Sequence, residues 1–291
     1  MRSVLPVLTI VAAIFALWYA GAVALNAPWA DDKARRAGVE LSFSELVADT
    51  WSQEKPKLPA PHQVAVEIWK TTGAMVASGR GFSKRSLIYH SWVTFSSTVL
   101  GFLLGTALGV ALATGIVYNR TMDLSVMPWV IASQTIPILA IAPMIIVVLN
   151  AIGISGLLPK AMISMYLSFF PVVVGMVKGL RSPSAMQLDQ MRTWNASAPQ
   201  TFRKLRLPAS MPYLFTSLKI AMAASLVGAI VGELPTGSVA GLGARLLSGS
   251  YYGQTIQIWS ALIMAATLAA VLVGLIGLIQ RITLRRMGMA R

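Results

Sequence analysis

Few residues in this chain have the types and the spacing that chemistry requires. There is no cysteine, which excludes disulfides and thiolate metal sites. The two histidines, His62 and His90, lack the spacing of metal ligands. Glu233 is the only acid in the apolar segments after Ser125, so the sequence lacks the paired carboxylates of acid–base catalysis. The phosphate-binding pattern G-x-x-x-x-G-K-[ST] is also missing, and we expect no catalysis, bound metal or cofactor in this chain.

Four polar side chains interrupt apolar segments and are candidates for a transport pathway: Gln134, Thr135, Ser225 and Glu233. A charge at membrane depth is costly and usually faces a cavity or a partner, which makes Glu233 a candidate for an outer gate. Exposure of Glu233 at the end of its helix is the alternative. Gln134 and Thr135 either face the pathway or bond backbone groups freed by a nearby proline. Ser225 either faces the same cavity or allows close helix packing.

A short basic stretch, NASAPQTFRKLRLPASMPYLF from Asn195 to Phe215, separates two long apolar runs. Asparagine tolerates left-handed backbone geometry, and Ser197 can cap a new helix that has Pro199 in its first turn. Pro208 is expected to end this helix. The pattern predicts a short helix with a basic face, separate from its neighbours and parallel to the membrane. Such a helix is unstable alone, so we expect it to dock on another protein.

The elements that position these residues are membrane helices. The chain has 291 residues, of which 56% are hydrophobic and 12% charged, and its mean hydropathy is +0.68. Continuous apolar runs of about 20 residues are long enough to cross a bilayer as helices. We therefore predict an all-α polytopic membrane protein with six transmembrane helices, at Val4–Leu25, Ser86–Ile116, Ser125–Leu149, Leu157–Val177, Tyr213–Leu234 and Ile256–Ile279.

The N-terminal part has two further features. Val4–Leu25 exceeds the apolar core of a signal peptide, about 7–15 residues, so we expect an uncleaved helix, with a cleaved signal as the alternative. Residues 26–85 are polar and form a predicted external segment, in which HQVAVEIWKTTGAMVA could lie on the membrane as an amphipathic helix. The expected domains are the N-terminal helix 1–25, the external segment 26–85 and a five-helix core 86–291.

Glycine recurs at about four-residue spacing in Ser86–Ile116, at Gly101, Gly105, Gly109 and Gly115. This spacing either brings a neighbouring helix close or reflects only the frequency of glycine in membrane helices.

The net charge of +14 is interpreted as topology and not as affinity for nucleic acid. Placing both termini in the cytoplasm puts most loop arginines and lysines there, together with the loop 178–211. Residues 26–85 then lie outside. Their basic residues have little influence on the orientation, because long segments count less in the positive-inside rule. Four basic residues oppose this assignment because it places them outside, namely Lys84, Arg85, Lys160 and Arg245.

The basic stretch resembles a known motif. Binding-protein-dependent ABC importer permeases carry a cytoplasmic loop of the form E-A-A-x3-G-x9-I-x-L-P, and DQMRTWNASAPQTFRKLRLP matches it at full spacing. Asp189 takes the place of Glu, Asn195 that of Gly and Leu205 that of Ile, while Leu207 and Pro208 are the closing pair. The two alanines are replaced by the bulkier Gln190 and Met191.

Three further segments resemble the nitrate/sulfonate/taurine-type branch of these permeases. They are TIPILAIAPM at 135–144, FFPVVVGMVKGLRS at 169–182 and VGELPTGSVAGLGARL at 231–246. With the loop motif between them, the resemblance covers roughly Ser86 to Arg286.

The resemblance implies the type I ABC importer permease fold in the bacterial inner membrane, surrounded by lipid. Its implied partners are two ATP-binding subunits, a second permease subunit (the same or a related chain) and an external solute-binding protein that delivers a small polar solute. It places the ATPase-coupling contact at Asp189, Arg192, Asn195, Ala196, Ser197, Phe202, Leu205, Leu207 and Pro208. We expect Phe202 or Leu205 to enter the ATPase as an apolar anchor. Asp189 and Arg192 either shape that contact or form only a surface pair.

Two other classes of function are considered. A secondary transporter or channel would need no ATPase, but the internal repeat common in transporters is not evident. A membrane-bound enzyme is the other class, but the sequence shows none of the motifs that such an enzyme would need. The solute stays open among nitrate, sulfonates, taurine, and pyrimidine or vitamin precursors.

Overall fold

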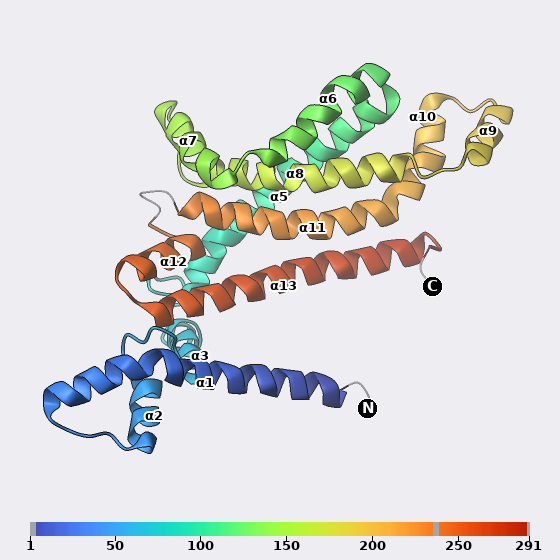
Figure 1. The fold of residues 1–291 in the computed structure, drawn as a ribbon. Helices are drawn as coiled ribbons and strands as arrows, with labels where there is room; N and C mark the ends of the chain where they lie inside the picture. Colours follow the sequence, from blue (N-terminus) through green and yellow to red (C-terminus); the bar gives the residue numbers. More distant parts are fainter. Residues whose placement is uncertain (1–3, 235–238, 290–291) are drawn as a thin grey trace. The chain divides into compact units, whose positions relative to one another are not determined.

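The computed structural model describes residues 4–234 and 239–289, and the regular structure in this part of the chain is entirely helical, as predicted (Figure 1). The chain forms two compact units. The first extends to Ser91 and includes Ala240–Ala265, and the second comprises Trp92–Val239 and the residues from Ala266 onward. Two long helices, α5 (Leu87–Tyr118) and α13 (Thr255–Arg286), contribute residues to both units.

The described residues contain five helices that are long and apolar enough to cross a membrane, or six if one bent pair is counted as a span. The five lie at Leu5–Ala37, Leu87–Tyr118, Leu157–Leu180, Ala198–Glu233 and Thr255–Arg286. Each covers a span predicted from hydropathy. The first helix, α1 (Val4–Ala37), continues well beyond the predicted end at Leu25.

The bent pair occupies the segment that was expected to be one span at Ser125–Leu149. It consists of α6 (Arg120–Ala132), which continues into the short η1 (Ser133–Thr135), and of α7 (Ile138–Ala151), and the two parts meet at 101°. Ile136 is extended because a residue that precedes a proline is disfavoured in helical geometry.

Residues 26–85, which were predicted to be external, contain the end of α1 and three further helices of the first unit: α2 (Phe43–Ser52), α3 (Pro61–Thr71) and α4 (Gly73–Ala77). The expected amphipathic helix is therefore two helices, interrupted at Thr72, where φ is −118° and ψ is −81°. A capping box starts α2, and hydrogen bonds from Ser42 lower the pKa of Glu45.

Asn26 of α1 fixes the residues around Thr50 and Leu58 to that helix. Its buried side-chain nitrogen donates to the carbonyls of Leu58 (2.8 Å) and Thr50 (3.3 Å). Its side-chain oxygen accepts from the N–H groups of Lys57 (2.8 Å) and Leu58 (3.2 Å). A buried amide with this set of partners orders the chain around it, so the segment is folded onto α1.

His90 makes a second long-range connection in the first unit. Its Nδ1 accepts from the N–H of Gly241 at 3.0 Å, so Nε2 carries the proton that is donated to the carbonyl of Lys84 at 2.9 Å. His90 therefore connects Gly241 to Lys84. Nearby in α12 (Leu242–Tyr251), burial lowers the pKa of the Arg245 guanidinium, and the charge of Glu67 opposes that shift.

The second unit is built on α8 (Leu157–Leu180) and α11 (Leu207–Glu233), which lie side by side (Figure 1). A Cβ atom added at Gly175 of α8 would lie 2.5 Å from Cβ of Ser217, and one at Gly179 would lie 2.8 Å from Cβ of Ser210. The two helices therefore touch at small residues.

Three of the α5 glycines have the same role against α8. A Cβ at Gly105 would lie 3.0 Å from the carbonyl oxygen of Met165 and still closer to the hydroxyl of Ser168. Gly101 and Gly109 are equally tight against Ala161–Met165 and Phe169–Val172. The close-approach interpretation is confirmed for these three positions, whereas Gly115 faces Met122.

Gly105→Val should destabilise the protein by about 1–3 kcal/mol, because the added side chain must push α5 away from α8. Gly274→Val in α13 is the matched control, since a Cβ there meets nothing within 4 Å. Thermal unfolding followed by size-exclusion chromatography in detergent measures both. Equal melting temperatures for the two variants would contradict the packing described here.

Candidate functional site

A separate short helix lies in the loop between α8 and α11. This helix, α9 (Ala185–Thr193), starts with a capping box. The N–H of Ser184 donates to Gln187 Oε1 at 2.9 Å, and the N–H of Gln187 donates to Ser184 Oγ at 3.4 Å. The loop therefore contains an ordered helix whose N-terminus is determined by its own sequence.

Asn195 ends the helix with a left-handed turn. Its φ is +52°, and it is the non-glycine residue with positive φ among residues 4–234 and 239–289. The N–H of Asn195 bonds to the carbonyl of Arg192 at 2.8 Å, and the N–H of Ala196 bonds to that of Met191 at 3.0 Å. These are the two bonds of a Schellman motif. The predicted left-handed geometry of Asn195 is confirmed.

The basic stretch after this turn is not the isolated helix that was predicted. Ser197 donates its N–H to Gln200 Oε1 at 2.8 Å and opens α10 (Ala198–Thr201), which continues through a π-helical turn, η2 (Phe202–Arg206), into α11. Ala198–Glu233 is one helix of 36 residues.

Pro208 does not end that helix because of the π-helical turn. The N–H of Leu207 bonds to the carbonyl of Phe202, five residues earlier. In this wider turn the backbone N–H groups bond to carbonyls five residues earlier instead of four. The change occurs directly before Pro208, which has no N–H to donate. The separate helix of the loop is therefore α9, which precedes the predicted one.

The apolar residues of this turn face inward. Phe202 and Leu207 pack against the core of the second unit, and the ring of Phe202 meets that of Tyr118 edge-on at 6.0 Å between centroids. Leu205 is partly buried beside Met191. The expectation of an outward-pointing anchor at Phe202 does not fit this placement, because Tyr118, which is distant in sequence, covers the ring.

Two arginines attach the ends of the loop to the helices. Arg206 donates to the carbonyl of Leu180 at 2.8 Å, and its guanidinium lies 5.7 Å from the ring centroid of Tyr118. Arg181 pairs with Asp123 at the start of α6, at 2.8 Å. Both ends of the loop are thus connected to the second unit.

Two exposed apolar residues that sequence reasoning missed lie at the two ends of α9, Met186 in its first turn and Trp194 directly after its last residue. Met186 is 79% exposed and Trp194 is 66% exposed. Asp189 and Arg192 form a 2.9 Å ion pair on the same helix, but both side chains are mostly exposed, so the pair contributes about 0–1 kcal/mol. One signal of this surface was available in the sequence, namely the large apolar side chain of Trp194 directly before Asn195.

A cavity of about 420 Å³ lies between α9 and the start of α10. Its lining combines polar amides with apolar side chains, namely Gln187, Gln190, Met191, Trp194, Ala196, Gln200, Lys204 and Leu205. The loop therefore presents a projecting tryptophan next to a hollow of small-ligand size.

Glu233 lies at the opposite end of α11 and is 1% exposed, so the alternative of an exposed helix end is wrong. The Thr94 hydroxyl of α5 lies 2.9 Å from Oε1 and 3.0 Å from Oε2 of Glu233. Lys160, in the first turn of α8, is close enough to interact electrostatically with this carboxylate. A buried charge needs such partners, so this end of α5, α8 and α11 is held together by polar contacts.

The other pathway candidates lie apart from Glu233. Ser225 is fully buried and donates to the carbonyl of Thr98 at 2.8 Å, and its own carbonyl accepts from Ser164 at 2.9 Å. It therefore joins helices at their contact. Gln134 and Thr135 are exposed in η1, where Thr135 bonds backbone of its own turn. Ser225 thus lies at a helix contact, whereas Gln134 and Thr135 lie on an exposed turn.

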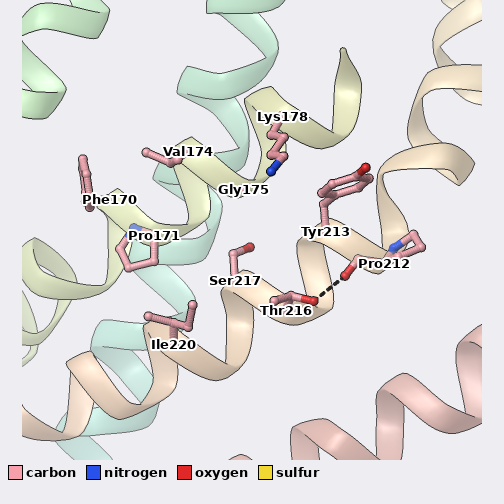
Figure 2. Close-up of a pocket in the computed structure, with 10 residues that line it drawn as sticks. All are labelled: Phe170, Pro171, Val174, Gly175, Lys178, Pro212, Tyr213, Thr216, Ser217 and Ile220. Carbon is pink, nitrogen blue, oxygen red and sulfur yellow. Dashed lines mark hydrogen bonds between the residues drawn. The ribbon is translucent and has the colours of Figure 1, made fainter. Parts of the chain in front are cut away.

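A groove of about 580 Å³ between α8 and α11 was also not foreseen from the sequence (Figure 2). Its lining residues are Phe170, Pro171, Val174, Gly175, Lys178, Pro212, Tyr213, Thr216, Ser217 and Ile220. The groove is mostly apolar, with Lys178 and Tyr213 toward the end where the loop begins.

Residues 105–289 match the family model of the binding-protein-dependent transport system inner membrane component. The chain belongs to this family. It is the permease subunit of an ATP-driven ABC importer, and separate ATPase subunits hydrolyse the ATP. The several apolar helices are those of a multi-pass membrane protein.

Curated relatives of this permease have similar lengths. A probable ABC transporter permease of Haemophilus influenzae is 29% identical over 233 residues, which cover 80% of this chain and 88% of the relative. The riboflavin transport permease RibX of Chloroflexus aurantiacus is 29% identical, covering 78% and 80%. A putative aliphatic sulfonates transport permease, SsuC of Bacillus subtilis, is 25% identical, covering 77% and 76%.

The fold agrees with a solved importer. The inward-facing MetNI methionine ABC transporter matches with a TM-score of 0.58 at 19% identity, covering 70% of this chain and 97% of the other. The predicted type I importer permease fold is confirmed.

Thr94→Val should destabilise the permease by about 1–3 kcal/mol, because the buried Glu233 carboxylate loses a hydroxyl donor. Thr94→Ser keeps the donor and should stay near wild type. Thermal unfolding at neutral pH compares the two variants. If valine is tolerated as well as serine, the hydroxyl contributes nothing to holding Glu233.

Proposed function

We propose that α9 is the segment through which an ATPase subunit drives this permease. The observation that carries the proposal is the isolation of α9 between the Ser184 cap and the Asn195 turn, with Met186 and Trp194 exposed on it. Large apolar side chains of this kind carry most of the energy of a protein interface. Asp189, Arg192, Ala196 and Ser197 surround these anchors and shape the contact.

Movement of α9 is passed to the membrane helices by the contacts at its ends. Arg206 joins the start of α11 to the end of α8, and Gly175 and Gly179 leave no space between these helices. The segment that follows α9 then holds its C-terminal end in place, because the segment belongs to the continuous helix. The residues concerned are Phe202, Leu205, Leu207 and Pro208. ATP-driven closure of the ATPase would shift α8 and α11 together.

The proposed assembly contains two ATP-binding subunits, two permease chains that are identical or related, and an external solute-binding protein. Support comes from the family and from the sequence, which encodes no phosphate-binding loop and no internal repeat. The pathway candidates Gln134, Thr135, Ser225 and Glu233 would then need the second chain to complete a cavity.

Both termini and the loop 178–211 are proposed to be cytoplasmic, with residues 26–85 outside. The distribution of loop arginines and lysines supports this orientation. The external residues would form a folded cap around Asn26, with α3 on the membrane surface and Trp69 among the headgroups.

The proposed solute is small and polar. Relatives are named for the transport of riboflavin, aliphatic sulfonates, nitrate and formylaminopyrimidine. The external binding protein would select among nitrate, sulfonates, taurine and small heterocycles of this kind.

Trp194→Ala and Met186→Ala should each weaken ATPase binding by about thirtyfold, since truncation of an interface anchor costs about 2 kcal/mol or more. ATP-dependent uptake should fall in proportion. Trp129→Ala and Met144→Ala are matched controls, because both residues are exposed on other helices of the unit. Co-purification of the ATPase and uptake into proteoliposomes measure the effect. Normal binding in both α9 variants, with detachment in Phe202→Ala, would move the contact to the π-helical turn.

Cysteines placed at Ser44 and Ser197 should react with an impermeant thiol reagent from opposite sides of the membrane. The chain has no native cysteine, so each label reports one position. Sealed cells and inverted vesicles give the two measurements. Labelling of both positions from the same side would overturn the proposed orientation.

A further inference from the structure

His90 is a buried histidine in which both ring nitrogens bond to backbone far from the ring's own turn. The residue is 2% exposed, and the ring of Tyr89 meets it edge-on at 5.6 Å between centroids. Nδ1 accepts from the N–H of Gly241 at 3.0 Å, and Nε2 donates to the carbonyl of Lys84 at 2.9 Å. A charged imidazole carries a proton on each nitrogen and accepts no hydrogen bond. The contact with Gly241 therefore exists only while His90 is neutral.

Gly241 is the residue from which α12 starts. It is buried, with a φ of +125° and a ψ of 162°, a geometry that favours glycine. Its carbonyl accepts from the N–H of Arg245 at 3.1 Å, which is the first bond of the helix. Because glycine has no side chain with which to cap a helix, its position depends on backbone contacts such as the one with His90. Loss of that contact would leave a buried N–H without its acceptor, which is costly.

The charges around His90 also oppose a second proton on the ring. Arg245, in the first turn of α12, acts on the imidazole with a charge of the same sign. Two acids of the neighbouring helices act on other groups, Glu67 of α3 on Arg245 and Glu233 of α11 on Thr94, one turn further along α5. A protonated His90 would thus be repelled by Arg245 in addition to losing its bond.

We propose that His90 is a pH-sensitive switch, which holds the start of α12 in place at neutral pH and releases it in acid. A released histidine side chain has its ordinary pKa of about 6.5 and takes up a proton below that pH. The held ring cannot do so without losing Gly241. Opening should therefore become about tenfold easier for each pH unit below 6.5, whereas above 6.5 the contact keeps its full strength.

Water can reach this end of α5. The 32 residues of the helix extend about 48 Å, whereas the hydrocarbon core of a bilayer is about 30 Å thick. His90 is the fourth residue of the helix, and Lys84 and Arg85 just before it are exposed. A proton from water can therefore bind as soon as the contact opens. In the proposed orientation this water is outside the cell, but the switch does not depend on that assignment.

Hydrogen exchange of the permease–ATPase complex in nanodiscs, followed by mass spectrometry at pH 7.5 and 5.5, tests the proposal. Once the intrinsic pH dependence of exchange is corrected for, peptides that cover Gly241–Arg245 should lose protection about tenfold at pH 5.5. His90→Asn offers an acceptor close to the position of Nδ1 and cannot become charged, so it should keep the same protection at both pH values. His62→Asn is the matched control at the other histidine, which is exposed, and should behave as the wild type.

Unchanged protection in the wild type, or an equal loss in the wild type and in His90→Asn, would overturn the proposal. A measurement on the unsubstituted ring covers the case in which His90→Asn fails to fold. The chain has two histidines, so labelling with ¹⁵N-histidine gives two imidazole signals, which His62→Asn assigns. At pH 7.5 the His90 signal should be that of a neutral ring protonated on Nε2. A ring protonated on Nδ1, or a charged ring, at this pH would also refute the switch. Both measurements are made without a membrane potential or a sealed compartment, so they stand if the proposed orientation is reversed.

Discussion

Close contact between small residues on α8 and its neighbours is the constraint on which the second unit depends. In a bilayer, the hydrophobic effect does not drive one apolar helix against another, and association rests on packing and on polar contacts between helices. Gly105 admits Ser168, and Gly175 admits Ser217, at distances that no side chain would allow. The Ser225 and Thr94 hydroxyls add hydrogen bonds between helices where the backbones are already close.

Because of this packing, α8 and α11 move together as one rigid pair. The loop between them can transmit force only because its two ends are attached to helices that cannot slide apart easily. Arg206 and Arg181 make those attachments through a carbonyl and a carboxylate, and the capped ends of α9 keep the loop helix intact. At the other end of the pair, the buried Glu233 carboxylate joins α11 to α5 through Thr94.

Hydropathy was sufficient to locate the five straight membrane helices, because length and apolar composition are local properties, but it did not reveal the 101° bend between α6 and α7. The left-handed residue at Asn195 was also predictable, since asparagine tolerates that geometry. The continuation of the helix through Pro208 was not, because it depends on a bond between Leu207 and Phe202 that no propensity indicates. The burial of Phe202 was also beyond reach, because Tyr118 covers it from a distant part of the chain. For Glu233 the sequence left a buried and an exposed position open, and the contact with Thr94 decides between them.

The π-helical turn at Phe202–Arg206 also determines how α11 is rotated about its own axis. Such a turn holds one residue more than regular α-helical winding, in which each residue advances by about 100°. Deleting one residue here would restore regular winding and leave the faces of α11 unchanged. The same deletion further along would rotate the following residues by about 100° and turn Ser225 and Gly228 away from α8. The turn therefore determines which face of α11 meets α8.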